Sequence, residues 1–182
     1  MSEATTFKAD LLAAIPSLRA FAVSLAQNSD KADDLVQETL VKAWDKQSSF
    51  QLGTNLKAWL FTILRNEFYS QMRKRGREVQ DSDGSMTARL AIHPSQEGKL
   101  DLQDFRKALQ LLPEDQREAI ILIGASGFSY EEAAEICGCA VGTIKSRVSR
   151  ARVRLQEILN ISGEADYGPD AISTQVMGTP VP

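Results

Sequence analysis

The chain has 182 residues, of which 43% are apolar and 25% are charged, and its net charge is −3. These fractions are ordinary for a soluble globular protein of one or two domains, and two cysteines with one histidine are too few for a disulfide framework or a structural zinc site. The N-terminal sequence lacks the features of a secretory signal and no apolar run approaches the roughly 20 residues of a membrane span, so we expect a cytoplasmic protein without membrane attachment.

Residues 8–75 contain three runs of apolar residues at three- and four-residue steps, and each run predicts an amphipathic helix. The segment Asn28-Ser29-Asp30 is predicted to end the first helix and to cap the second. Thr54 or Asn55 is predicted to cap the third. The first part of the chain is therefore expected to be a small helical unit.

The third of these helices ends in a basic segment, since residues 65–77 contain five basic residues against Glu67 alone. From residue 78 the sequence becomes rich in Ser, Asp, Gly and Gln and contains Pro94. This change of composition predicts a linker over residues 78–100. Basic segments between acidic ones are the charge pattern expected of a protein that binds a phosphate backbone.

A second helical block is predicted from about residue 100 to about residue 159. A helix over 104–112 is expected to end at Pro113, which suits the first position of a following helix over 114–125. Gly127 is expected to close that second helix. The block therefore begins with two short helices that no long loop separates.

The centre of this block predicts a helix-turn-helix. Ser129 and Glu132 form a capping box that opens a short helix over 130–137, and Gly138 stands where a helix end favours a left-handed residue. A helix over 141–159 follows, and residues 140–155 of the chain hold five basic residues and no acidic one. A helix, a short glycine-containing turn and a basic helix together make up this motif.

Cys137 and Cys139 lie at the turn and raise the question of a metal or redox site. Two thiols at positions i and i+2 converge poorly on one metal ion, and no histidine or third cysteine lies nearby. We therefore expect no metal and no cofactor, and we interpret both cysteines as small buried or half-buried packing residues.

The exposed side of the basic helix carries groups that can hydrogen-bond base edges in a major groove or hold phosphates. They are Thr143, Lys145, Ser146, Arg147, Arg150 and Arg154. The alternative is a solvated basic face without a ligand, although such faces normally include acidic residues.

Several segments from both blocks together resemble the sequence of a known protein family. In chain order they are Asp34-Leu35-Val36-Gln37-Glu38-Thr39 followed by Trp44, Asn55-Leu56-Lys57-Ala58-Trp59-Leu60 with Asn66, Leu112-Pro113-Glu114-Asp115-Gln116-Arg117, Tyr130-Glu131-Glu132-Ala133-Ala134 and Val141-Gly142-Thr143-Ile144-Lys145-Ser146-Arg147. Over about residues 8–158 the chain resembles, in order and spacing, the extracytoplasmic-function sigma factors of bacterial RNA polymerase. Its second block is similar to the alphaproteobacterial general-stress-response group. The resemblance implies promoter-specific transcription initiation, here of general stress response genes.

The resemblance also implies an all-α fold of two small helical domains joined by a flexible linker. A sigma-2 domain is expected at residues 1–77, the linker at 78–100 and a sigma-4 domain with the helix-turn-helix at 101–160. The acidic segment 161–182 is expected to be disordered.

In the family, a helix of sigma-2 docks on a coiled coil of the polymerase β′ subunit. The resemblance assigns this contact to Asp33, Asp34, Gln37, Glu38 and Trp44, and helical spacing places Asp34, Gln37 and Glu38 on one face. The alternative for these acids is an ordinary solvated face. Trp44 is expected first of all to be a core aromatic, as is Trp59.

The same domain is implied to recognise and melt the −10 element, which requires a pocket for a flipped base. Phe50, Asn55 and Asn66 match that pocket, and Asn66 as a plain helix-surface residue is the alternative. Five side chains are expected to follow the backbone of the strand: Arg65, Tyr69, Arg73, Lys74 and Arg77.

For sigma-4 the resemblance implies recognition of the −35 element. Lys145, Ser146 and Arg150 match its base-contacting positions, and Arg147 and Arg152 are expected at phosphates or in the fold. Residues 105–128 are implied to hold the β flap of the polymerase, and an anti-sigma factor is implied as a further partner.

Two other function classes stay open at this point. One is a helix-turn-helix regulator that binds duplex DNA without polymerase, and the other is a sigma-like decoy for an anti-sigma factor. An enzyme is not expected, because no nucleophile with a neighbouring base and no phosphate-binding glycine loop is present, and His93 lies in the predicted linker.

Overall fold

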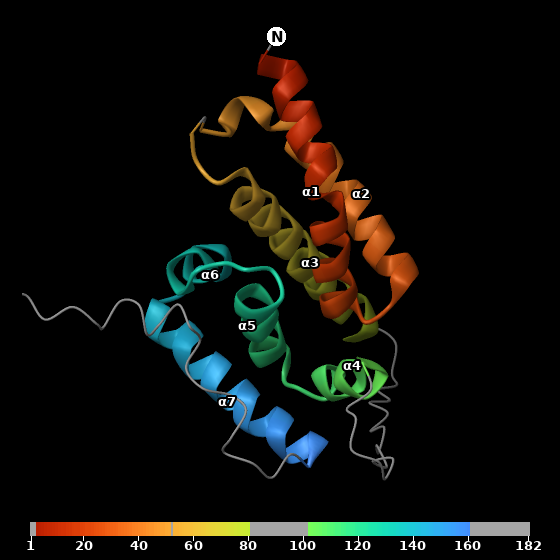
Figure 1. Cartoon of the computed structure of the whole chain (residues 1–182). Coiled ribbons are helices and arrows are strands. Elements are labelled where there is room, and N and C mark those ends of the chain that lie inside the picture. Colours follow the sequence, from red (N-terminus) through yellow and green to blue (C-terminus); the bar gives the residue numbers. More distant parts are fainter. Residues whose placement is uncertain (1–2, 52, 81–101, 161–182) are drawn as a thin grey trace, which may run out of the picture.

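The computed structural model describes residues 3–51, 53–80 and 102–160 (Figure 1). Most of the linker expected at 78–100, and all of the tail expected at 161–182, lie outside these residues. The described residues form seven α-helices and one 3-10 helix and contain no strand. The all-α prediction is therefore confirmed for this part of the chain. The elements are α1 (Glu3–Ala26), α2 (Ser29–Asp45), η1 (Gln47–Ser49), α3 (Leu56–Gln80), α4 (Leu102–Gln110), α5 (Glu114–Gly124), α6 (Tyr130–Cys137) and α7 (Val141–Leu159).

The N-terminal half, residues 3–80, is a bundle in which α1, α2 and α3 all contact one another. Its core contains large side chains that are fully buried, and the Phe21 and Phe61 rings stack at 4.8 Å between centroids. The predicted caps are confirmed, since Asn28 accepts a hydrogen bond from the Lys31 backbone and Asn55 from the Ala58 backbone. These caps satisfy orphan N–H groups in the first turns of α2 and α3.

One stretch of α1 corrects an expectation. Phe7–Ala26 is long and apolar enough to cross a membrane by length and composition, with a mean hydropathy of 1.5, so the expectation that no segment approaches a span was wrong on that measure. The helix reaches this value because Leu12 and Val23 on its exposed side add to a buried apolar face. That face, which includes Phe21, packs against α2 and α3.

The C-terminal half, residues 102–160, holds the helix-turn-helix. Both hydrogen bonds of the Ser129–Glu132 capping box are present, and Gly138 ends α6 in the left-handed region with φ 63°. A buried seam locks α6 against α7, and it consists of Ala133, Ala134, Ile136, Cys137, Ile144 and Val148. Two boundaries differ slightly from the predictions: Pro113 precedes α5 instead of starting it, and Gly127 follows the end of that helix by three residues.

The two halves pack against each other, with α3 against α6 and α1 against α5 (Figure 1). The Phe61 and Phe128 rings meet edge to face at 4.9 Å between centroids, and buried residues of both halves form one continuous apolar cluster. The sequence pattern predicted two separate amphipathic blocks, and it did not predict this shared core.

Candidate nucleic-acid interface

The basic helix α7 exposes half of its six predicted contact residues fully to solvent. Ile144, Val148, Ala151 and Leu155 are buried at three- and four-residue spacing, so the opposite side of the helix faces outward. Lys145, Arg150 and Arg154 are exposed there, while Thr143, Ser146 and Arg147 are half-buried. The helix therefore offers a cationic face of the size and chemistry that enters a major groove.

Two of these side chains are positioned by neighbouring helices. Arg147 Nε lies 3.2 Å from Asp115 Oδ2 of α5, and its guanidinium also lies 3.9 Å from the Cys139 sulfur. Lys145 Nζ stands 5.8 Å from the centre of the Tyr130 ring of α6. Ser146 Oγ donates to the Thr143 carbonyl at 2.9 Å. The first turns of α7 are thus braced by both helices that they cross.

The cysteines fit the packing interpretation. Cys137 is buried and Cys139 is half-buried, and burial raises the pKa of Cys137 to about 12. A thiol with so high a pKa stays protonated near neutral pH and is a poor nucleophile or metal ligand. Among residues 3–51, 53–80 and 102–160, no group of three or more His, Cys, Asp or Glu side chains could hold a metal ion.

The acidic side of α2 is only partly free. Asp33 receives two hydrogen bonds from Arg19 of α1, with Nε–Oδ1 at 2.6 Å, and this contact lowers the pKa of the Asp33 carboxyl. Asp34, Gln37 and Glu38 are exposed, and Glu38 pairs with Lys42 at 3.2 Å. Asp34 and Gln37 therefore remain open to a partner.

Trp44 was expected to be a core aromatic, and this expectation was wrong, because 44% of its surface is exposed. Its ring lies 6.5 Å from that of Phe7, at the edge of an aromatic cluster that also contains Phe50 and Trp59. Phe50 and Trp59 are half-buried and meet at 5.3 Å between ring centres. The loop before α3 is thus anchored by aromatic packing.

On α3 the predicted contact residues point in two directions. Asn66, Arg73, Lys74 and Arg77 are exposed. Arg65 and Tyr69 point instead toward α5, where Arg65 Nε lies 2.7 Å from Glu118 Oε1. The Tyr69 hydroxyl lies 3.4 Å from the second oxygen of the same carboxylate, and burial together with Glu118 raises the pKa of Tyr69.

The pattern of residues along the sequence did not single out Glu118, although only 1% of its surface is exposed. Glu118 occupies an ordinary position in an amphipathic helix, and its partners lie 49 and 53 residues away along the chain. Nothing local marks it as buried. The sequence pattern also did not single out the contact of Lys57, whose Nζ donates to the distant Ser126 carbonyl at 2.7 Å.

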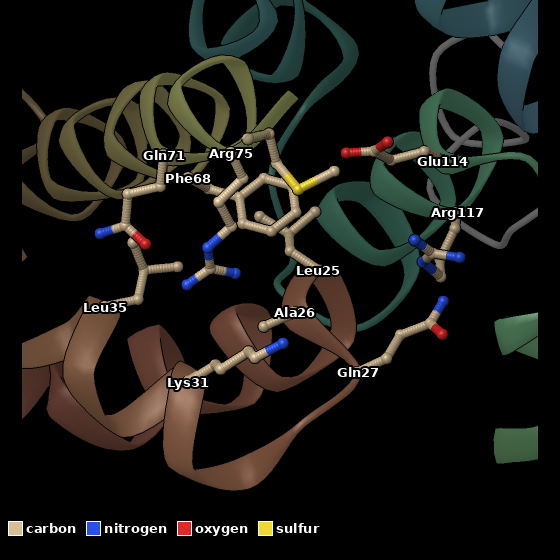
Figure 2. Close-up of a pocket in the computed structure, with 11 residues that line it drawn as sticks. Leu25, Ala26, Gln27, Lys31, Leu35, Phe68, Gln71, Arg75, Glu114 and Arg117 are labelled. Atoms are coloured by element: carbon tan, nitrogen blue, oxygen red, sulfur yellow. The ribbon is translucent and has the colours of Figure 1, made fainter. Parts of the chain in front are cut away.

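Two hollows flank these surfaces. A pocket of about 260 Å³ lies between the halves. In Figure 2, Lys31 and Arg75 lie across this pocket from Glu114 and Arg117 of α5. An apolar groove of about 370 Å³ lies between α4, α5 and α7. Its walls include Phe105, Leu109, Ile120, Leu155 and Leu159. An apolar groove of this volume can receive a hydrophobic segment of a partner protein.

Comparison with known proteins agrees with this division of the chain. The family model described as Sigma-70 region 2 matches residues 12–78, and the one described as Sigma-70, region 4 matches residues 102–155. The ECF RNA polymerase sigma factor EcfG of Rhodopseudomonas palustris (strain TIE-1) is 62% identical over 169 residues, which cover 93% of this chain and 93% of that protein.

Two solved structures show the same similarity. The sigma factor RpoE from Bartonella quintana, crystallised with the anti-sigma factor NepR, is 73% identical with a TM-score of 0.76, over 87% of this chain and 99% of that chain. CnrH, solved in complex with the cytosolic domain of CnrY, is 25% identical with a TM-score of 0.58, over 87% of this chain and 88% of that chain.

Proposed function

The chain belongs to the extracytoplasmic-function (ECF) sigma factors, and we propose on this basis which of its surfaces bind polymerase and promoter DNA. It binds core RNA polymerase and directs promoter-specific transcription initiation. The observation that carries this function is the match of sigma-70 regions 2 and 4, in that order, to the two helical halves. A regulator that acts without polymerase would need only the second match.

We propose the domain limits expected from the sequence, with a sigma-2 domain at residues 1–77 and a sigma-4 domain at 101–160. In sigma-4, α7 enters the major groove of the −35 element. Lys145 and Arg150 are exposed on its outer face and can donate to base edges. Arg147, braced by Asp115, and Arg154 are placed to hold phosphates.

For the −10 element we propose the exposed side of α3 together with the loop before it. Asn66 offers an amide that can hydrogen-bond a flipped nucleobase. The loop before α3 is held in place by the packing of Phe50 in the aromatic cluster. Arg73, Lys74 and Arg77 form a cationic track for the single strand. Asn55, Arg65 and Tyr69 belong to the same surface but contact the C-terminal half here.

Two surfaces suit the polymerase subunits. Asp34 and Gln37 on α2 can meet arginines of the β′ coiled coil, with Trp44 exposed at the end of the same helix. The apolar groove between α4, α5 and α7 can take a hydrophobic segment of the β flap. Core polymerase would then fix the spacing of two DNA-binding domains that each bind weakly alone.

An anti-sigma factor is a further partner, as in the complex of RpoE with NepR. The likeness to EcfG supports a role in general stress response genes. It also supports a functional sigma factor over a sigma-like decoy. The chain is a transcription regulator and not a catalytic enzyme, and we place it in the cytoplasm, where bacterial polymerase and chromosome lie.

The test separates a sigma factor from a polymerase-independent regulator. Fluorescent duplexes from a promoter library are incubated with the chain alone, with core polymerase alone, and with both. We expect stable, sequence-selected complexes only when both proteins are present. Equal selection by the chain alone would favour the conventional helix-turn-helix regulator and would contradict the proposal.

A further inference from the structure

The surface proposed to melt the promoter is partly covered by the chain itself. Three of its side chains, Asn55, Arg65 and Tyr69, make their hydrogen bonds to carboxylates of the C-terminal half. Their exposed neighbours Asn66 and Arg73 make no such contact among the described residues. The covered part of this surface therefore consists of Asn55, Arg65 and Tyr69.

The principal contact is a two-pronged ion pair. Arg65 Nε lies 2.7 Å from Glu118 Oε1 and Arg65 Nη2 lies 3.3 Å from Glu118 Oε2. The side chains are 18% and 1% exposed. A guanidinium binds a carboxylate and a phosphate with the same fork of donors. Glu118 therefore occupies the donors that Arg65 would otherwise direct toward the backbone of a DNA strand.

A second carboxylate holds the loop before α3. Asn55 Nδ2 donates to Glu132 Oε1 of α6 at 2.6 Å. The other oxygen, Oε2, accepts the Ser129 backbone N–H at 2.9 Å, and these two contacts lower the pKa of Glu132. Glu132 is thus a fixed, ionised acceptor. The amide of Asn55 therefore has one of its two N–H donors occupied, and this donor is not available to read a base.

The interface around both carboxylates is specific and partly apolar. Lys57 donates to the Ser126 carbonyl at 2.7 Å, and its ammonium lies 5.1 Å from the centre of the Phe128 ring. Phe128 in turn packs edge to face on Phe61. A buried ion pair adds little net stability because its desolvation offsets the attraction, but it selects one geometry. The contact is therefore well defined and can still be reversed.

We propose that the free chain closes on itself, with Glu118 and Glu132 of the C-terminal half standing in for DNA at Arg65 and Asn55. This inference rests on the proposed function, since it assumes that those two residues serve the −10 element. Opening must separate α5 and α6 from α1 and α3. Lys145, Arg150 and Arg154 stay exposed in the closed arrangement, so closure masks part of the −10 surface and leaves these −35 residues exposed.

The test uses Glu118→Gln, which keeps the shape of the side chain and removes its charge. Small-angle X-ray scattering of the full chain without partners reports whether the halves separate. Fluorescence anisotropy with a pool of random single-stranded 12-mers reports access to the covered surface. We expect Glu118→Gln to enlarge the radius of gyration and to raise the affinity about tenfold, as follows if roughly nine-tenths of the wild-type chain is closed.

The matched control is Glu135→Gln. Glu135 lies exposed on α6, and this substitution removes the same charge from the same half of the chain. It should leave the radius of gyration unchanged and raise the affinity no more than twofold. If circular dichroism shows that Glu118→Gln is unfolded, Lys57→Met tests the interface through a different polar contact, the one to Ser126, and should show the same two changes.

Wild-type scattering that already fits separated halves would overturn the proposal, as would folded Glu118→Gln or Lys57→Met chains with unchanged size and affinity. Neither readout uses polymerase or a promoter. A chain that opens in Glu118→Gln but never supports transcription would therefore refute the proposed function and leave self-closure standing.

Discussion

Asp115 of α5 holds Arg147 of α7 by an ion pair of 3.2 Å across the helix-turn-helix. The Arg147 side chain is 23% exposed, so the pair fixes the guanidinium near the N-terminal end of the helix proposed to read DNA. A helix outside the motif therefore orients one of its contact residues. This relationship leads to the first prediction.

Asp115→Asn is expected to weaken −35 recognition without unfolding the domain. Loss of the carboxylate frees Arg147 to sample other rotamers, at a cost of about 1 kcal/mol in promoter binding by the holoenzyme, or roughly fivefold. Asp104→Asn on α4, whose partner Lys107 lies on the same helix, is the control. Anisotropy titration on a promoter that carries both elements measures the difference, and equal affinity of the two variants would show that Asp115 plays no part.

Asp34→Lys is expected to lower the affinity for core polymerase at least tenfold, because it places a cation opposite partner arginines. Asp34 is exposed and makes no ion pair within the described part of the chain, so the fold should be unaffected. Asp10→Lys on the exposed side of α1 serves as the control. Competition for core polymerase against a labelled wild-type chain measures the effect, and unaltered competition by Asp34→Lys would remove α2 from the docking surface.

Gly138→Ala and Gly142→Ala form a matched pair for stability. A Cβ at either position meets no described atom within 4 Å, but Gly138 has φ 63° and Gly142 is helical. We expect Gly138→Ala to lower the free energy of unfolding by about 1 kcal/mol or more, and Gly142→Ala to be neutral or to raise it by about 0.5 kcal/mol. Urea unfolding followed by circular dichroism gives both values, and equal effects would contradict the left-handed role of Gly138.

The raised pKa of Cys137 predicts a loss of stability at alkaline pH. Burial raises this pKa from 9.0 to about 12, so the folded thiol holds its proton more tightly than the unfolded one. The contribution of this thiol to the free energy of unfolding is fully present below pH 9. It is lost as the pH rises toward 12, by no more than about 1.4 kcal/mol per pH unit.

Unfolding midpoints at pH 8, 9 and 10 for the wild-type chain and for Cys137→Ala measure this effect. The variant is less stable overall because a buried sulfur is lost, but its midpoint should fall less steeply between pH 9 and 10. Parallel pH profiles would mean that the thiol ionises as easily when folded as when unfolded.

Local chemistry made much of the fold predictable. The Ser129–Glu132 capping box and the left-handed Gly138 follow from neighbouring residues alone, and the structure has both. Trp44 was misplaced because a helical apolar pattern does not tell which residues lie at the end of a bundle, where its ring is 44% exposed.

The contact between the halves could not be predicted from the sequence, because its residues lie far apart along the chain. Glu118 is separated from Arg65 by 53 residues and resembles any surface glutamate until the two halves are packed together. Its burial depends on how α3 meets α5, and no short segment specifies that geometry. The site residues, exposed or covered, could be proposed from residue type, spacing and the family resemblance, whereas the carboxylates that cover Asn55, Arg65 and Tyr69 required the three-dimensional arrangement.

The most direct measurement is run-off transcription with the purified chain and core polymerase on a promoter library, with Asn66→Ala and Arg150→Ala in parallel. Asn66 and Arg150 are exposed on α3 and α7, so both variants should fold normally. The account predicts defined transcripts that require the chain and that weaken at least tenfold in each variant, through the −10 element for Asn66→Ala and the −35 element for Arg150→Ala. The absence of chain-dependent transcripts, in reactions where a known sigma factor is active, would contradict it.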